Sequence, residues 1–211
     1  MLEFHLLVFR LQTVTRRWNL WRNVLSKIAI HPGVAMNTNP SRRQMLSWAA
    51  AAAGSLLLPT SLWAASKTPG MTEGPFYPRA KDLPLDQDND LTTIAGKSGV
   101  AAGVLLDFGG RVVDENGKPQ RNALVEIWQC DANGRYRHPR DRADVEEDPD
   151  FQGFGHTLTD ADGRYRFRTI RPVPYPGRTP HIHVRVRHAT LGEVTSQLFV
   201  AGDPGNERDF L

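Results

Sequence analysis

The clearest structural signal in the 211-residue chain is the run Thr157-Leu158-Thr159-Asp160-Ala161-Asp162-Gly163-Arg164-Tyr165-Arg166-Phe167-Arg168. Asp-Gly between two segments of strand-like composition is among the strongest short-range signals for a tight turn in a hairpin. Tyr165 and Phe167 are two residues apart, so their rings lie on the same face of a strand. We therefore predict that both rings point into a core.

The same pattern recurs on either side of this run. Gly110-Arg111-Val112-Val113 leads into Asp114-Glu115-Asn116-Gly117, and residues 123–128 form a second strand-like run that returns after the turn. Further strand-like runs cover residues 181–187 and 196–200, and no helical period of comparable strength follows residue 66. The chain is thus predicted to be all-β, a β-sandwich of short antiparallel strands in which these turns join hairpins.

Composition limits the chain to one ordinary globular domain, with 40% apolar and 23% charged residues. The net charge of +3 is unevenly placed: residues 1–65 hold seven Lys/Arg and one Asp/Glu (+6), and residues 66–211 hold nineteen and twenty-two (−3). Nucleic acid is therefore not expected as a partner. Cys130 is the single cysteine, which excludes an intramolecular disulfide. We interpret it as a small buried strand residue rather than a nucleophile.

The N-terminal region has the anatomy of an export signal. Ser41-Arg42-Arg43-Gln44-Met45-Leu46 precedes an Ala/Leu-rich stretch at 48–58 and the small residues Ala64-Ala65-Ser66, which resembles a twin-arginine signal. The stretch is shorter than the ~20 residues that span a bilayer, so cleavage is favoured over a permanent anchor. We expect residues 1–35 to be an overextended start and 36–66 a signal peptide, with this whole N-terminal leader disordered or helical. Residues 67–211 are expected to be a periplasmic domain that meets the membrane only during export.

The run His181-Ile182-His183-Val184-Arg185-Val186-Arg187 carries the first candidate functional residues. Strand alternation places Ile182, Val184 and Val186 on one face and both imidazoles on the other. Two imidazoles a strand repeat apart can bind one metal ion. The alternative is the solvent-facing polar side of a half-buried strand, which Arg185 and Arg187 would equally satisfy.

Two tyrosines are candidates to complete such a site. The proline-rich loop 172–180 would hold Tyr175 and Arg178 close to the imidazoles with little freedom, although Tyr175 could instead pack on proline rings. Tyr136 lies among cations and lacks the alternating apolar partners that Tyr165 has. Because phenol has a pKa near 10, tyrosine binds as phenolate only to a strongly Lewis-acidic ion. Two histidines and two tyrosines would therefore favour ferric iron, Fe(III), over zinc or magnesium.

Several strings together resemble one known family, and they occur in that family's order. They are Thr72-Glu73-Gly74-Pro75-Phe76-Tyr77-Pro78, Val125-Glu126-Ile127-Trp128-Gln129, Gly134-Arg135-Tyr136-Arg137-His138, Thr159-Asp160-Ala161-Asp162-Gly163, Pro174-Tyr175-Pro176 and His181-Ile182-His183. The resemblance is to the intradiol ring-cleavage dioxygenases, such as protocatechuate 3,4-dioxygenase and catechol 1,2-dioxygenase. It runs from about residue 72 to 205.

The resemblance implies a non-haem Fe(III) enzyme that uses O2 to open a catechol-type ring to a muconate-type diacid. Its iron ligands would be Tyr136, Tyr175, His181 and His183. Tyr175 would leave the metal to take up a substrate proton, Arg178 would stabilise developing negative charge, and Gln197 would line the pocket. A homo-oligomer is compatible with this reading.

The sequence also departs from the family. Five residues separate Tyr175 from His181, where protocatechuate-type enzymes have a longer loop, and Gly177 stands where an aromatic residue often occurs, so a more open pocket is expected. The chain ends at Asp209-Phe210-Leu211, and an early end of the domain is expected. Residues 109–170 also resemble prealbumin-like β-sandwich modules, which gives a non-catalytic binding or spacer module as the alternative function. A third hypothesis is an iron site that persists without catalysis.

Overall fold

The computed structural model describes residues 5–13, 67–84 and 86–211, the first range through its backbone alone. The described residues form strands and two short 3-10 helices and contain no α-helix, as the sequence predicts. The strands are β1 His5–Thr13, β2 Leu105–Val113, β3 Leu124–Trp128, β4 Phe154–Leu158, β5 Arg164–Ile170, β6 His181–His188 and β7 Gly192–Phe199. The 3-10 helices are η2 Ala80–Asp82 and η3 Asn206–Arg208.

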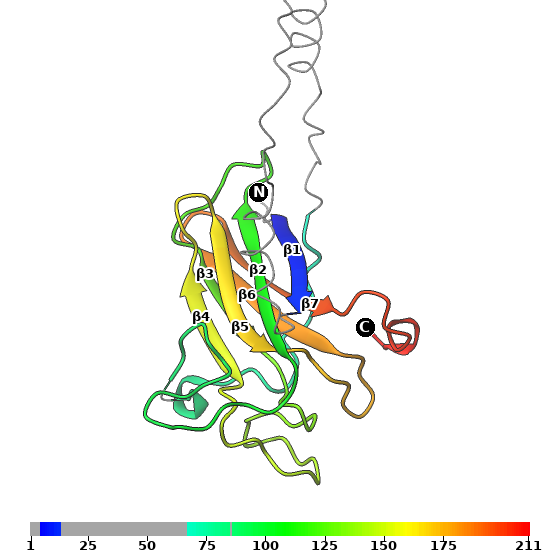
Figure 1. The fold of residues 1–211 in the computed structure, drawn as a ribbon. Coiled ribbons are helices and arrows are strands. Elements are labelled where there is room, and N and C mark those ends of the chain that lie inside the picture. The colour runs from blue at the N-terminus through cyan, green and yellow to red at the C-terminus, as the bar shows by residue number, and fades with distance from the viewer. Residues whose placement is uncertain (1–4, 14–66, 85) are drawn as a thin grey trace, which may run out of the picture. The chain divides into compact units, whose positions relative to one another are not determined.

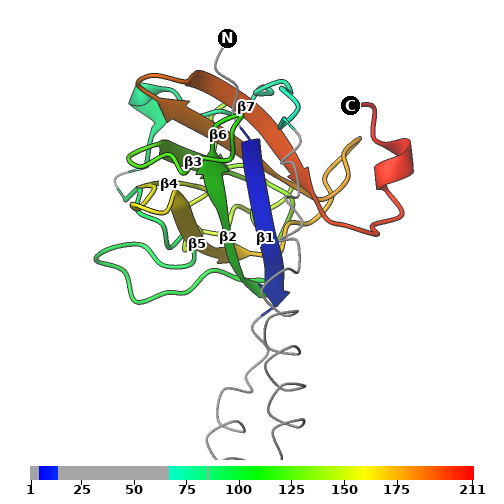
Figure 2. The ribbon, with the colours of Figure 1, turned by 90° about the horizontal axis from the view of Figure 1, so that it is seen from above.

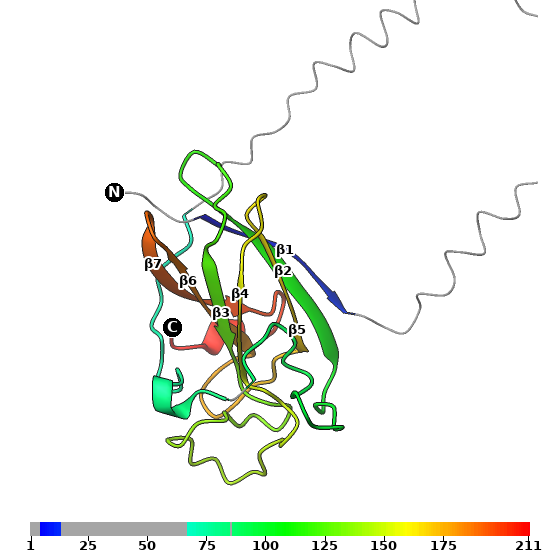
Figure 3. The same cartoon turned by 90° about the vertical axis from the view of Figure 1, so that its left-hand side faces the viewer.

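The strands form two antiparallel sheets, which face each other in Figures 1 and 3. One sheet has the order β1-β2-β5, and the other has the order β4-β3-β6-β7. Figure 2 shows β1 and β2 of the first sheet below β6 and β7 of the second. The predicted all-β sandwich is therefore confirmed.

The core between the sheets is built from alternate residues of four strands. Its buried members in these strands are Leu106, Phe108 and Val112 of β2, Val125 and Ile127 of β3, Tyr165, Phe167 and Ile170 of β5, and Ile182, Val184 and Val186 of β6. Tyr165 and Phe167 contact each other there with ring centroids 6.1 Å apart. Burying one such large side chain contributes roughly 1.5–3 kcal/mol. The predicted inward orientation of these two rings is confirmed.

The two tight turns do not join hairpins, which corrects one prediction. The backbone reverses locally at each turn, since Gly117 N donates to Asp114 O (2.9 Å) and Gly163 N donates to Asp160 O (3.0 Å). However, β2 pairs with β1 and β5, and β3 pairs with β4 and β6. Both edges of β2 are thus already paired. After each turn the chain crosses to the other sheet.

Gly163 shows how closely its turn packs on β2. Its φ is +73°, and a Cβ there would lie 2.4 Å from the carbonyl oxygen of Val112. Val112 N donates in turn to Gly163 O over 2.8 Å. Only glycine allows this backbone approach.

The leader differs in part from its expected disordered or helical state. His5–Thr13 form β1, which pairs antiparallel with β2 from His5 opposite Val113 to Thr13 opposite Leu106. Pairing satisfies backbone N–H and C=O groups on that edge of β2. The twin-arginine motif and its apolar stretch lie outside the described residues. Among the residues that are described, no helix is long and apolar enough to span a bilayer.

Candidate metal centre

The two histidines of β6 lie side by side on the face opposite the core. His181 and His183 are each 2% exposed, and their Nε2 atoms are 3.2 Å apart. The interpretation as a solvent-facing polar edge is therefore wrong for this pair. Two imidazole nitrogens that bind one ion at about 2.0–2.1 Å in neighbouring positions lie about 3 Å apart, so this spacing suits a shared metal.

Neighbouring groups fix both imidazole rings. His181 Nδ1 lies 2.7 Å from the carbonyl oxygen of Thr179. Trp128 stacks on His183 with centroids 4.8 Å apart and an interplanar angle of 7°, because the two residues are register partners across β3 and β6. Such outer contacts set the direction in which a ligating nitrogen points.

The loop before β6 brings Tyr175 and Arg178 to the same place. Arg178 N donates to Tyr175 O over 2.9 Å, and Gly177 has φ +81°. With Pro176 before it, this glycine satisfies the sequence requirements of a type II turn. The Tyr175 ring lies 5.6 Å from the His181 ring between centroids. The predicted proximity of this loop to the imidazoles is confirmed.

Tyr136 reaches the site from a separate turn. Asp131 Oδ1 accepts the amides of Asn133 and Arg135, both at 2.9 Å. Gly134 has φ +80°, and a Cβ there would lie 3.2 Å from Pro174 O, so glycine allows this turn to approach the proline-rich loop.

As a result, the Tyr136 ring lies near both other kinds of candidate ligand. Its centroid is 5.4 Å from that of Tyr175 and 6.1 Å from that of His183. Tyr136 is 3% exposed, and its hydroxyl has no hydrogen-bond partner among the described residues. A buried, unpaired hydroxyl is costly unless a ligand satisfies it.

Burial shifts the pKa of all four side chains toward the neutral form. It raises the pKa of Tyr136 well above its usual 10.0, and the nearby Tyr175 adds to this shift. Burial also raises the pKa of Tyr175. The pKa values of His181 and His183 are lowered, again mainly by burial. Neutral imidazoles keep a lone pair for a metal, but the phenols can bind as phenolates only by losing a proton.

The donor set fits a trivalent ion. Within the described ranges, no three His, Cys, Asp or Glu side chains gather into a metal site, so the phenols are the oxygen donors available beside the histidine pair. A phenol whose pKa is raised needs a strong Lewis acid to displace its proton. Ferric iron satisfies this requirement better than zinc, which prefers Cys, His and carboxylate ligands.

Arg178 and Gln197 lie at the edge of the cluster. Arg178 Nη2 donates to Gln197 Oε1, and Arg178 Nη1 lies 3.5 Å from the Tyr175 hydroxyl. Gln197 is the register partner of His183 on β7, and its Nε2 donates to Thr72 O over 3.0 Å. The structure thus brings together all six residues that the sequence indicated: Tyr136, Tyr175, Arg178, His181, His183 and Gln197.

Sequence reasoning missed three residues that shape the site. Trp128 covers His183, Phe76 stacks on Tyr136 with centroids 4.6 Å apart, and Asp209 forms an ion pair with Arg178. Strand alternation could have placed Trp128, since it lies two residues after Glu126 on the face opposite Val125 and Ile127. Phe76 lies in one of the strings that resemble the family but was given no role in the site, and no local pattern points to Asp209.

A comparison with protein families gives one match of direct relevance. The family described as Dioxygenase matches residues 72–211, which include the whole cluster. The chain belongs to the intradiol dioxygenase family. This membership favours an enzyme over the non-catalytic module.

Individual relatives agree with this assignment. The chain is 47% identical over 134 residues to the protocatechuate 3,4-dioxygenase beta chain of Burkholderia cepacia, covering 59% of this chain and 56% of that one. Among solved structures, it resembles the dioxygenase domain of a dioxygenase carbohydrate-binding protein fusion from Streptomyces sp. SirexAA-E, with a TM-score of 0.51, 32% identity, and coverage of 68% and 81%. It also resembles catechol 1,2-dioxygenase from Acinetobacter sp. ADP1, with a TM-score of 0.53, 27% identity, and coverage of 79% and 55%. The matches span about half the length of the curated relatives.

Proposed function

We propose that this dioxygenase holds Fe(III) and opens a catechol-type ring between its two hydroxyl-bearing carbons. Both atoms of O2 would enter the product, a muconate-type dicarboxylic acid. The observation that carries the proposal is the convergence of two imidazoles and two phenols in one buried cluster, with the Nε2 atoms of His181 and His183 3.2 Å apart. Tyr136, Tyr175, His181 and His183 would be the ligands.

Tyr175 and Arg178 would have separate roles beside the iron. The chemistry that Fe(III) supplies at such a site is to hold a catecholate and withdraw electron density from its ring. Tyr175 is the more accessible of the two tyrosines, so its phenol oxygen is the one placed to take up a proton from the substrate. Arg178 is a fixed cation beside that oxygen, and a fixed cation in a site shielded from water stabilises negative charge as it develops.

The decisive experiment uses the purified full chain. Its iron content and visible spectrum are recorded, and catechol is then added under air while oxygen uptake and muconate absorbance are followed. The expected result is about one iron per chain, a reddish phenolate-to-iron absorption band, a shift of this band on adding catechol, and one O2 consumed per catechol. A folded chain that stays colourless after iron loading would refute the proposal, and a coloured chain without oxygen uptake would indicate an iron site that lacks catalysis.

Arg178 provides a second test of the division of roles. Arg178→Ala removes the cation and leaves all four proposed ligands intact, so the resting colour and iron content should persist. Turnover should fall about 10²–10³-fold, the usual cost of losing one group that stabilises transition-state charge. Loss of the colour together with the activity would place Arg178 in the binding of iron instead.

We also propose that residues 36–66 direct export of residues 67–211 to the periplasm. The support is the pair Arg42-Arg43 ahead of an apolar stretch. Arg42→Lys/Arg43→Lys should retain the enzyme in the cytoplasm, as cell fractionation would show. Export that continued unchanged in this variant would exclude the twin-arginine route.

A further inference from the structure

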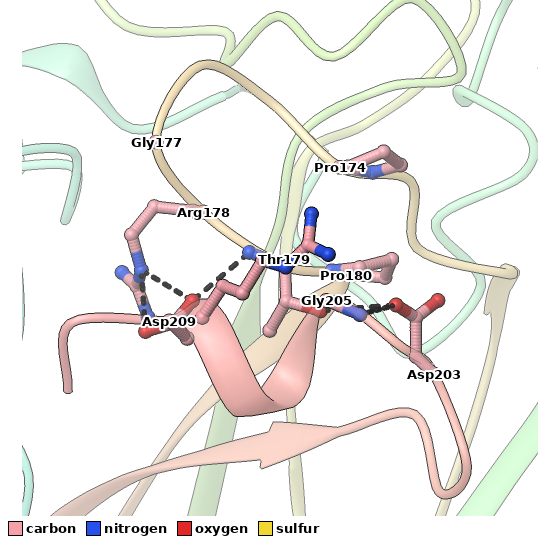
Figure 4. A pocket seen from close by; sticks show the side chains of 9 residues that line it. Pro174, Gly177, Arg178, Thr179, Pro180, Asp203, Gly205 and Asp209 are labelled. Carbon is pink, nitrogen blue, oxygen red and sulfur yellow. Dashed lines mark hydrogen bonds and ion pairs between the residues drawn. The ribbon is translucent and has the colours of Figure 1, made fainter.

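The segment that follows β7 folds back onto the proline-rich loop. Through η3 it places the Asp209 carboxylate next to Arg178, and Figure 4 shows the two side chains pointing toward each other. Arg178 Nε donates to both carboxylate oxygens, over 3.2 Å to Oδ1 and 3.0 Å to Oδ2. The two side chains are 7% and 3% exposed, so this ion pair is buried.

Two backbone amides also donate to the same carboxylate. Thr179 N donates to Asp209 Oδ2 over 2.9 Å, and Leu211 N donates to Oδ1 over 3.1 Å. Burial alone would raise the pKa of Asp209, but the bonds from the Thr179 amide and from Arg178 outweigh it and lower this pKa. The carboxylate therefore stays charged and tied to the residue beside Arg178.

These bonds leave the guanidinium little freedom to rotate. With Nε held by Asp209, Nη2 faces Gln197 and Nη1 faces the Tyr175 hydroxyl. The Phe210 ring lies over the guanidinium, 5.2 Å from its carbon to the ring centroid. A planar guanidinium that is hydrogen-bonded through Nε presents its other N–H groups in a fixed direction.

Packing alone does not supply this restraint. A cavity of about 370 Å³ borders Arg178 and is lined by Pro174, Gly177, Pro180, Asp203 and Gly205 among others, as Figure 4 shows. The guanidinium would have room to swing into it if the ion pair were lost. The hydrogen bonds to Asp209, together with the one to Gln197, therefore hold the guanidinium in its direction.

We propose that Asp209 is a positioning residue for ring cleavage, which acts by aiming the Arg178 guanidinium at the Tyr175 oxygen. The inference rests on the proposed function. The hydrogen bonds of Asp209 go to Arg178 and to the backbone amides of Thr179 and Leu211, so it acts on the proposed iron ligands mainly through Arg178. An Arg178 left free would misplace its charge by an ångström or more, and such a misplacement can cost about 100-fold in rate.

The test compares Asp209→Ala and Asp209→Asn with the parent in the iron-loaded full chain, with catechol as substrate. We expect kcat to fall about 10- to 100-fold, KM to change less than about threefold, and iron content and resting colour to persist. Asp209→Asn keeps an oxygen that can accept from the Thr179 amide. Its kcat therefore tests the positioning role even if Asp209→Ala does not fold. The control is Glu207→Gln, an exposed acid of η3, which should leave kcat unchanged.

A double-mutant cycle separates positioning from a general effect on the fold. In an Arg178→Ala background, Asp209→Ala should cause no further loss of kcat, because the group that it aims is already gone. If kcat of the double variant fell by the product of the two single-variant losses, the inference would be overturned. It would also be overturned if kcat per bound iron stayed at the parent value in both Asp209 variants. A parent chain without iron or turnover would instead refute the proposed function and, with it, this role.

Discussion

Two tyrosines in nearly identical local sequences have different surroundings. Tyr136 follows Gly134-Arg135, and Tyr165 follows Gly163-Arg164. Both are buried, and both hydroxyls lack a hydrogen-bond partner within the described part of the chain. Tyr165 packs between the sheets with Phe108 and Phe167, whereas Tyr136 lies beside Tyr175 and His183. Only Tyr136 has neighbours that can share a metal.

This difference predicts opposite outcomes for the same substitution. Tyr136→Phe should lower the affinity for iron more than about 100-fold, beyond the roughly 10- to 100-fold cost of losing an outer contact, and should remove the visible band. Stability should change little, since the ring remains and an unpaired buried hydroxyl is lost. Iron analysis and the spectrum measure the effect. Tyr165→Phe is the matched control, which should stay coloured and active; a coloured Tyr136→Phe enzyme would exclude this residue as a ligand.

Cys130 is predicted to be chemically inert in the folded protein. Its side chain is 1% exposed, as the sequence predicted, but it follows the end of β3 and does not lie in a strand. Burial raises the pKa of its thiol to about 12. Between pH 7 and 9 the thiol therefore stays protonated, and only the thiolate reacts readily. A disulfide reagent should react with one thiol per chain in denaturant and with almost none in the native protein. Rapid reaction of the native chain at pH 8 would show that this thiol is accessible.

At the scale of strands and turns, alternation was a good guide and turn type was not. The pattern His181-Ile182-His183 correctly separated core residues from site residues, because side-chain direction alternates along any strand. Asp-Gly and Asn-Gly specify a local reversal of the backbone. They carry no information on which sheet the next strand joins, so the hairpins predicted at both turns were wrong.

Local sequence patterns could not predict the contacts that Asp209 and Phe76 make in the site. Asp209 meets Arg178 across 31 positions of the chain, and Phe76 meets Tyr136 across an even longer separation. Such contacts arise from the tertiary fold. The resemblance to a family supplied the site residues because its ordered motifs encode that fold.

The turns themselves are testable elements. Gly163→Ala would force its Cβ against the Val112 carbonyl oxygen, whereas a Cβ at Gly117, with φ +76°, meets nothing within 4 Å. Both variants are strained by the positive φ, at a cost of about 1 kcal/mol. Gly163→Ala should lose about 2 kcal/mol or more beyond Gly117→Ala, because backbone atoms must shift. Urea unfolding measures the difference, and equal stabilities would show that β2 yields easily at Val112.

For the molecule as a whole, the fold and the metal centre are separable. None of the four proposed ligands belongs to the core cluster between the sheets. Removing iron with a reductant and a chelator should therefore leave the β-sheet circular dichroism intact. Iron held at about 100 times its dissociation constant adds about 2.7 kcal/mol, so Tm should drop by about 5–10 °C on removal. An iron-free chain without β-sheet signal would show that the metal is needed for folding.

The crossing of the chain between sheets at each tight turn also bears on how the protein is made. Roughly fifty residues separate β2 from its partner β5 in the sequence, and a similar number separate β3 from its partner β6. At 5–20 residues per second on the ribosome, neither ladder can close for several seconds after its first strand emerges. A nascent chain in this interval exposes strand edges that invite aggregation, so we expect yields of soluble enzyme to rise with slower expression or added chaperone.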